Sequence, residues 1–121
     1  MLQPTVKFSA ANIAAFKKAL RRQHDMLRSG HVDEALASAF GFKSHAAMLH
    51  ILNQLGGSTR VVIQIDPCLL IVRLEEFGYH GLSLDAVRRL AWDLPFPDAW
   101  RSDETEGAMR GRFLPVAANS R

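Results

Sequence analysis

The chain has 121 residues and a formal net charge of +3 at pH 7, from 15 Lys or Arg residues against 12 Asp or Glu residues. With 48% hydrophobic and 22% charged residues, the composition is typical of a folded domain and excludes a disordered chain. The single cysteine excludes an internal disulfide, and no apolar run reaches the roughly 20 residues that span a bilayer. The first residues also lack the apolar stretch of a secretory signal. We therefore expect one cytoplasmic domain without a membrane partner.

The N-terminal part predicts a long amphipathic helix. Ser9 is a suitable N-cap, the sequence that follows is rich in alanine and cations, and we expect the helix to run to about Arg28 and to stop at Gly30. At 100° per residue one narrow sector of this helix is apolar and is expected to face the core. It contains Ile13, Phe16, Leu20, His24 and Leu27.

Two shorter helices are expected next. The first covers about residues 32–40, has Asp33 and Glu34 in its first turn, where the helix dipole favours negative charge, and ends at Gly41. The second starts from Ser44 as its cap and runs to about Leu55. Residues 1–57 thus form a helical unit.

After Ser58 the pattern changes. Residues 59–65 are rich in β-branched side chains and predict a strand. Asp66 and Pro67 suit the start of a helix through Phe77, although residues 69–74 also fit a buried strand; we favour the helix. Ser83 is expected to cap a further helix to about Asp93.

The predicted fold class is α+β and mainly α: a three-helix unit, one or two short strands and one or two further helices. Residues 1–100 are expected to form a single domain, with 1–57 helical and basic and 58–100 holding the strand and the remaining helices. The chain should be irregular from Pro95 onward and loosely ordered over 101–121, although residues 112–116 could add an edge strand beside 59–65.

Charge is distributed unevenly along the chain. Residues 1–57 hold seven Lys or Arg residues against three acids. An anionic partner should therefore meet this part, and phosphate contacts to nucleic acid are the chemistry that a basic helix face favours. The candidate nucleic-acid-binding residues are Lys17, Lys18, Arg21, Arg22, Arg28 and Lys43.

The second and third helices also invite a helix-turn-helix interpretation. A small residue at Ala37, a glycine at Gly41 and a cap at Ser44 stand in the order of such units. The helix over 44–55, however, has no arginine, the commonest reader of base edges. We therefore favour a purely structural helical hairpin over DNA recognition by this helix.

The first 55 residues carry a family resemblance. The turn Phe40-Gly41-Phe42-Lys43 between two Ala/Leu-rich helices, preceded by the basic helix over 17–27, resembles the glyoxalase-related small helical domain. The resemblance implies a helical domain of the kind found in bacterial and mobile-element proteins, without an assigned activity and without a glyoxalase active site.

Catalytic and metal-binding patterns are absent from the sequence. His45 and His50 are five residues apart, whereas two ligands on one helix face stand three or four apart. His24 lies on an apolar face, where we expect a boundary residue with one nitrogen hydrogen-bonded rather than a ligand. Cys68 precedes an apolar run, and we expect it to be buried and unreactive. We expect a non-enzymatic protein without cofactor, metal or small-molecule substrate.

An alternative is a protein-interaction module. Aromatic residues are concentrated over 92–100, and Trp and Arg are frequent anchors of interfaces. We expect Trp92 and Phe96 to close the core, and Trp100 with Arg101 to form a site for a protein partner or for a second copy. A small anti-defence inhibitor or a toxin–antitoxin component would fit this interpretation.

Overall fold

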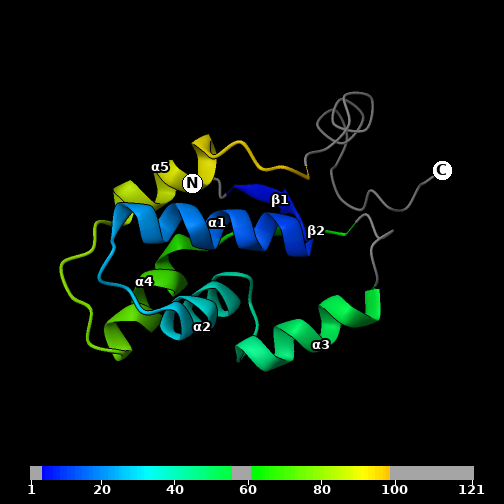
Figure 1. The fold of residues 1–121 in the computed structure, drawn as a ribbon, viewed down its shortest axis with the longest axis horizontal. Helices are drawn as coiled ribbons and strands as arrows, with labels where there is room; N and C mark the ends of the chain where they lie inside the picture. The colour runs from blue at the N-terminus through cyan, green and yellow to red at the C-terminus, as the bar shows by residue number, and fades with distance from the viewer. Residues whose placement is uncertain (1–3, 56–60, 99–121) are drawn as a thin grey trace.

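The structure is a computed structural model that describes residues 4–55 and 61–98 of the chain. Its elements are β1 (Thr5–Lys7), α1 (Ala10–Gln23), α2 (Ser29–Ala39), α3 (His45–Leu55), β2 (Val62–Gln64), α4 (Pro67–Glu76) and α5 (Leu84–Asp93). The fold is α+β and mainly α, which confirms the predicted class (Figure 1). Among the described helices none is both long and apolar enough to cross a membrane.

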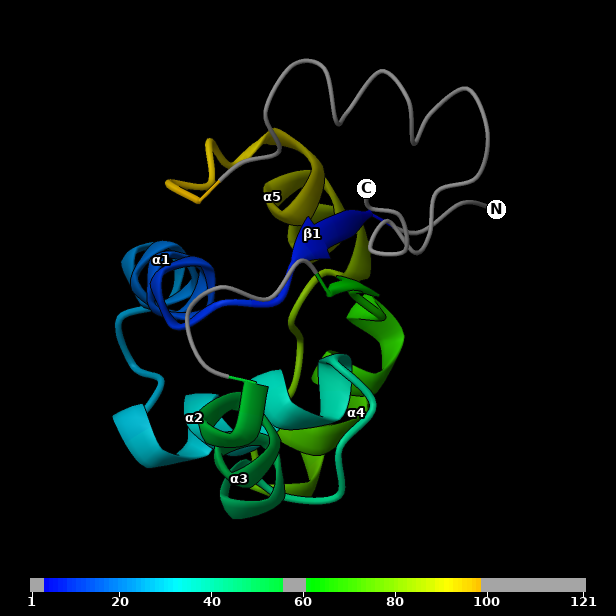
Figure 2. The same ribbon diagram turned by 90° about the vertical axis from the view of Figure 1, so that its right-hand side faces the viewer.

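Four helices surround the core. α1 contacts α2 and α5, and α4 contacts the same two helices, so the ring closes in the order α1, α2, α4, α5. Figure 2 shows this ring with α1 on the left, α5 at the top, α4 on the right and α2 below. α3 contacts α2 from outside the ring. The core therefore lies between the pair α1 and α2 and the pair α4 and α5, and not against a face of the sheet.

α2 contributes most to the core because much of its surface is buried. Its buried side chains are Val32, Ala35, Leu36, Ala37 and Ala39. Three of these are alanines, whose small side chains let α1, α3 and α4 approach its backbone closely. The glycine predicted to end this helix does so, since Gly41 has a φ of 88°.

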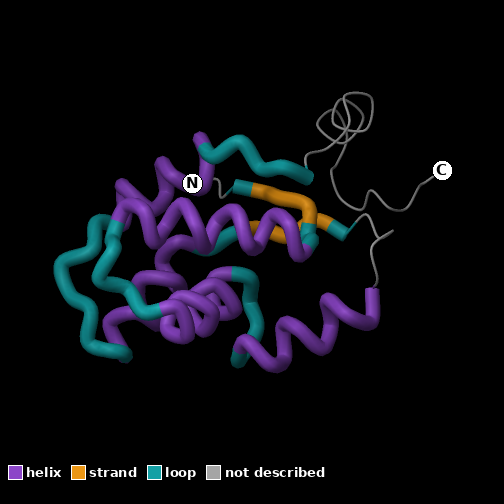
Figure 3. Tube along the Cα trace, in the orientation of Figure 1, coloured by secondary structure: helices purple, strands orange, loops and turns teal. Residues whose placement is uncertain are grey.

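The sheet has two short antiparallel strands, drawn in orange in Figure 3. Val6 pairs with Ile63, and hydrogen bonds from Phe8 N–H to the Val61 carbonyl and from Ile65 N–H to the Pro4 carbonyl, both 2.8 Å, extend the ladder. β2 confirms the strand predicted over 59–65, in shortened form. Its partner is the unpredicted strand β1, and residues 112–116, the expected edge strand, lie outside the described residues.

The boundary between the first two helices differs from the prediction. α1 ends at Gln23 rather than Arg28, because the chain turns at His24, whose carbonyl accepts the Leu27 N–H at 3.1 Å. Gly30 does not stop a helix but lies in the first turn of α2. Since α2 starts at Ser29, Asp33 falls outside its first turn, where we had expected it.

Three other helix starts agree with the sequence. The side-chain oxygens of Ser44, Asp66 and Ser83 each accept a backbone N–H three residues further on, at 3.0, 3.3 and 3.1 Å. These caps satisfy N–H groups that the first turn of a helix leaves unpaired. The alternative left open for residues 67–77 is thereby decided in favour of helix α4.

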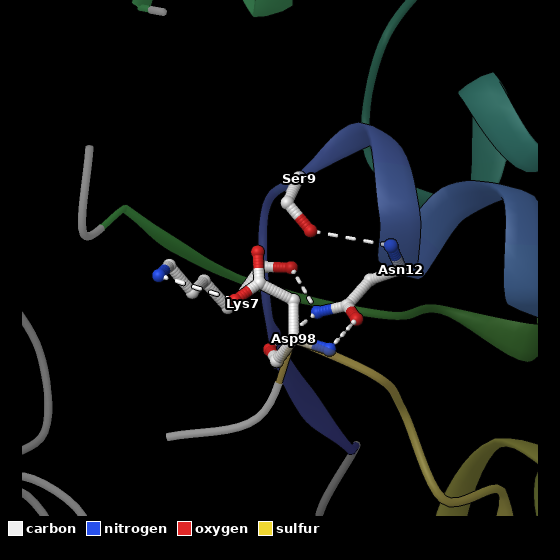
Figure 4. A network of polar contacts seen from close by, with 4 residues as sticks. All are labelled: Lys7, Ser9, Asn12 and Asp98. Carbon is white, nitrogen blue, oxygen red and sulfur yellow. Dashed lines mark hydrogen bonds and ion pairs between the residues drawn. The ribbon is translucent and has the colours of Figure 1, made fainter. Parts of the chain in front are cut away.

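Asn12 joins the start of α1 to residues that follow α5 (Figure 4). Its side chain, 1% exposed, donates to the carbonyl oxygens of Lys7 and Asp98, both at 2.9 Å, and accepts the Asp98 N–H at 2.9 Å. Lys7 also forms an ion pair with the Asp98 carboxylate at 3.4 Å. Nearby, Phe96 packs edge-on against Phe16. The chain after α5 is therefore fixed over α1, and Phe96 closes the core as predicted.

Candidate nucleic-acid interface

α1 carries four cations and no acid. They are Lys17, Lys18, Arg21 and Arg22, all in its C-terminal half. Because 100° separates successive residues, Lys18, Arg21 and Arg22 point away from the sector of Phe16 and Leu20, which are fully buried. The outer face of α1 is therefore basic, as the sequence predicted.

Lys17 differs from the other three cations. Its Nζ lies 2.8 Å from the Asp33 carboxylate of α2, and the two side chains are only 26% and 25% exposed. The ion pair links α1 to α2 and leaves the positive charge of Lys17 largely compensated. Lys17 was predicted to contact phosphate; in the structure its ammonium group is engaged by a carboxylate of the neighbouring helix.

Three further predicted residues do come together. Lys18, Arg21 and Arg22 are exposed, and none of them has an acidic partner in the described part of the chain. Arg21 Nε–H donates to the Leu27 carbonyl oxygen at 3.2 Å. The Leu27 carbonyl and the Arg28 nitrogen form one peptide bond, so the Arg21 side chain lies beside the backbone of Arg28.

Arg28 completes a group that we call the basic cluster: Lys18, Arg21, Arg22 and Arg28. Arg28 is exposed and occupies the N-cap of α2, where no side chain caps the helix. Its N–H donates to the Tyr79 hydroxyl at 3.1 Å, and this hydroxyl lies 2.8 Å from His31 Nδ1. These contacts fix the position of the Arg28 backbone.

The last predicted residue, Lys43, lies apart from the cluster. It follows α2 at the end opposite to Arg28, and the eleven residues of this helix span about 16 Å. Lys43 is exposed, with no ion-pair partner among residues 4–55 and 61–98. The six predicted residues therefore divide into one cluster of four, a compensated lysine and a distant lysine.

Helix electrostatics explains only part of this arrangement. Cations in the last turn of a helix, such as Arg21 and Arg22, interact favourably with the helix dipole. A cation at the start of a helix, such as Arg28, meets the positive end of the dipole and is unfavourable. The cluster therefore concentrates positive potential beyond what stability of the two helices requires.

The surface over the cluster is open. The described residues that line a shallow hollow of about 430 Å³ are Ala14, Lys17, Lys18, Arg21 and Arg22. Because all of them belong to α1, they do not enclose a small molecule. One acid, Asp25, is exposed in the turn after α1 and forms no ion pair in the part of the chain that the structure describes.

Two predictions about other candidate residues are wrong. Cys68 is exposed rather than buried, because the buried face of α4 consists of Pro67, Leu70, Ile71 and Leu74, and Cys68 points elsewhere. Trp92 is 51% exposed rather than part of the core. At 100° per residue it lies about 140° from Val87 and about 100° from Ala91, which face the core instead.

The remaining candidates have these positions. Trp100 and Arg101 lie outside the described residues. The described part of the chain holds no group of three His, Cys, Asp or Glu side chains that could bind a metal. His24 caps the end of α1, and its buried Nε2 has no hydrogen-bond partner among residues 4–55 and 61–98. The sequence analysis missed the contacts of Asn12, because the sequence around it does not predict a contact with residue 98.

Comparison with protein-family models, curated proteins and solved structures finds no match to the chain. The resemblance of the first 55 residues to the glyoxalase-related domain therefore stays a prediction. Arguments about function rest on the surface described above.

Proposed function

We propose that this protein is a small non-catalytic binding protein that contacts the phosphate backbone of nucleic acid through the basic cluster. One observation carries the proposal: four exposed cations lack acidic partners in the described residues, while Lys17, in the same helix as three of them, is paired. If these cations served solubility alone, acidic side chains beside them would serve it equally well. Unpaired cations on one surface attract polyanions, and electrostatic steering speeds their association.

The proposed contact is sequence-independent. The residues of the cluster lie on the outer face of α1 and at the start of α2, where they reach phosphates along one side of a duplex. α3, the recognition helix of the helix-turn-helix interpretation, has no Lys or Arg to anchor it on phosphate. Its exposed His50, Asn53 and Gln54 would therefore need another element for docking.

The proposal is tested by matched charge reversals. Arg22→Glu removes a cluster cation, and Lys43→Glu makes the same change in net charge at an exposed site away from the cluster. Binding to a short fluorescent DNA duplex should weaken much more for Arg22→Glu than for Lys43→Glu. Equal weakening by both variants would show that only net charge matters.

A second experiment is recovery of nucleic acid with the protein from a lysate. Its loss after nuclease treatment or at high salt would support the proposed contact with phosphate.

A second candidate function is protein binding through α5. The observation that favours it is Trp92, a large aromatic side chain exposed beside two arginines. Trp and Arg dominate the binding energy of many interfaces. Trp92→Ala should then weaken association with a protein partner, whereas Arg22→Glu should not.

A further inference from the structure

The exposed face of α5 combines an aromatic side chain with charges of both signs. It consists of the exposed residues Asp85, Arg89, Trp92 and Asp93 and of the partly exposed Arg88. Tryptophan presents up to about 250 Å² of surface, so a half-exposed Trp92 leaves roughly 100 Å² in contact with water. A large aromatic side chain exposed in this way is available as a binding anchor.

The charges of this face are unevenly paired within the protein. Asp85 and Arg88 form an ion pair at 3.0 Å. Arg89 and Asp93 are one helical turn apart, yet they form no pair in the described structure. At a spacing of four residues, this order, with the cation nearer the N-terminus, is less favourable for a pair on one helix than the reverse order. Each charge is therefore free to meet an opposite charge elsewhere.

Asp93 stands at an unfavourable place in its helix. It is the last residue of α5, where the negative end of the helix dipole repels a carboxylate. Two unfavourable features therefore meet at one surface: a carboxylate at the C-terminus of a helix and a large aromatic side chain in water. Such departures are expected where a surface has a function.

We propose that α5 is a self-association surface, on which the α5 helices of two copies of this chain pack antiparallel. The argument is charge complementarity. We take the two helices to cross midway between Leu90 and Ala91 of each copy. Two residues, one from each copy, then lie at the same height along the helix axis when their numbers add to 181. Each unit by which the sum differs from 181 shifts them apart by about 1.5 Å along the axis. Arg89 then lies within one residue of Asp93 of the second copy. Trp92 lies within one residue of Arg88 of the second copy.

The two contacts fall on different flanks of the face. Around the helix axis, Arg89 and Asp93 lie on one side of Asp85, and Arg88 and Trp92 lie on the other. In an antiparallel helix pair, residues on the same flank meet each other. Both contacts can therefore form together, an ion pair on one flank and a cation–π contact on the other, and symmetry makes each of them twice.

The inference specifies the second candidate function and does not depend on nucleic-acid binding. The surface is one helix of ten residues, about 15 Å long, which is smaller than the interface of a stable dimer. The expected complex is therefore a weak dimer in rapid exchange, observed only at high protein concentration.

The test uses sedimentation equilibrium of the nuclease-treated full chain, from about 10 µM to about 1 mM. The wild-type protein should shift from monomer to dimer. Arg89→Asp and Asp93→Arg should each remain monomeric, because each places like charges opposite one another in a symmetric pair. Mixed in equal amounts, these two variants should form a 1:1 complex, because every Asp then meets an Arg. Circular dichroism verifies that both variants are folded.

Trp92→Ala should also weaken the dimer, and Lys43→Glu, outside the surface, should leave it unchanged. A wild-type protein that is monomeric at every concentration would overturn the inference. So would two folded variants that fail to associate when mixed, or a dimer that survives Asp93→Arg. A monomeric wild type that loses a defined protein partner on Trp92→Ala would overturn self-association while retaining the second candidate function.

Discussion

The adjacent residues Lys17 and Lys18 differ in their electrostatic state, and this difference predicts how the protein responds to salt. Each cation that neutralises a phosphate of duplex DNA releases counterions, so the logarithm of affinity falls with the logarithm of salt concentration by about 0.9 per contact. The four residues of the basic cluster predict a slope of about −3.6. Between 50 and 200 mM salt, affinity should therefore fall by about 150-fold.

The perturbation is Lys18→Met, which removes one cluster charge and keeps a long unbranched side chain with good helix propensity. Its slope should be about −2.7, and its affinity should fall only by about 40-fold over the same salt range. The control combines Lys17→Met with Asp33→Asn. It removes the ion pair between α1 and α2 without changing the net charge or the cluster, so the slope should stay at about −3.6.

The assay is fluorescence anisotropy of a labelled duplex, titrated with each protein at several salt concentrations between these limits. A wild-type slope near zero would refute the phosphate contacts. A control slope as low as that of Lys18→Met would refute the distinction between the paired and the unpaired lysine. In the first case the basic face would be a solvated helix surface, and in the second Lys17 would contact phosphate as Lys18 does.

Three predictions concern stability. Asn12→Ala removes three hydrogen bonds of about 1 kcal/mol each, so the free energy of unfolding in urea should fall by about 3 kcal/mol; a loss well under 1 kcal/mol would show that other contacts hold Asp98. Asp66→Ala removes the cap of α4 and should cost about 1 kcal/mol in the same assay, whereas Asp66→Asn keeps a capping oxygen and should cost much less; equal losses would contradict the cap. Gly41→Ala should lower Tm because its φ of 88° costs a non-glycine residue about 1–2 kcal/mol, although no atom lies within 4 Å of the added Cβ; an unchanged Tm would contradict this.

Helix starts could be predicted from the sequence because a cap is a local interaction. Ser44, Asp66 and Ser83 each bind a backbone group within three residues, and the structure places a helix after each of them. The end of α1 could not be predicted in this way. Apolar periodicity continues to Leu27, which is buried, but the backbone has already turned at His24. Burial of a side chain does not require a continuous helix.

The candidate site shows a similar division. Charge periodicity predicted a basic outer face for the first helix, and Lys18, Arg21 and Arg22 are exposed there. It could not show that Lys17 is paired, because Asp33 belongs to another helix. The error on Trp92 has a different origin: residue type suggested burial, whereas its angle, about 140° from the buried Val87, indicated exposure. Helical angle is the better guide where the two disagree.

The contacts made by β1 and by Asn12 determine the order in which the chain can fold during synthesis. The helix pair α2 and α3 joins neighbouring segments and can form as soon as both have been made. β1 is made before β2 but pairs only when β2 is available, and Asn12 receives its partner Asp98 only 86 residues later. Residues 5–12 thus leave the ribosome well before the segments that complete their contacts. Closure of the fold is consequently a late step that depends on residues after α5, and a chain cut short before residue 98 would leave Asn12 buried with only its bond to the Lys7 carbonyl or exposed to water.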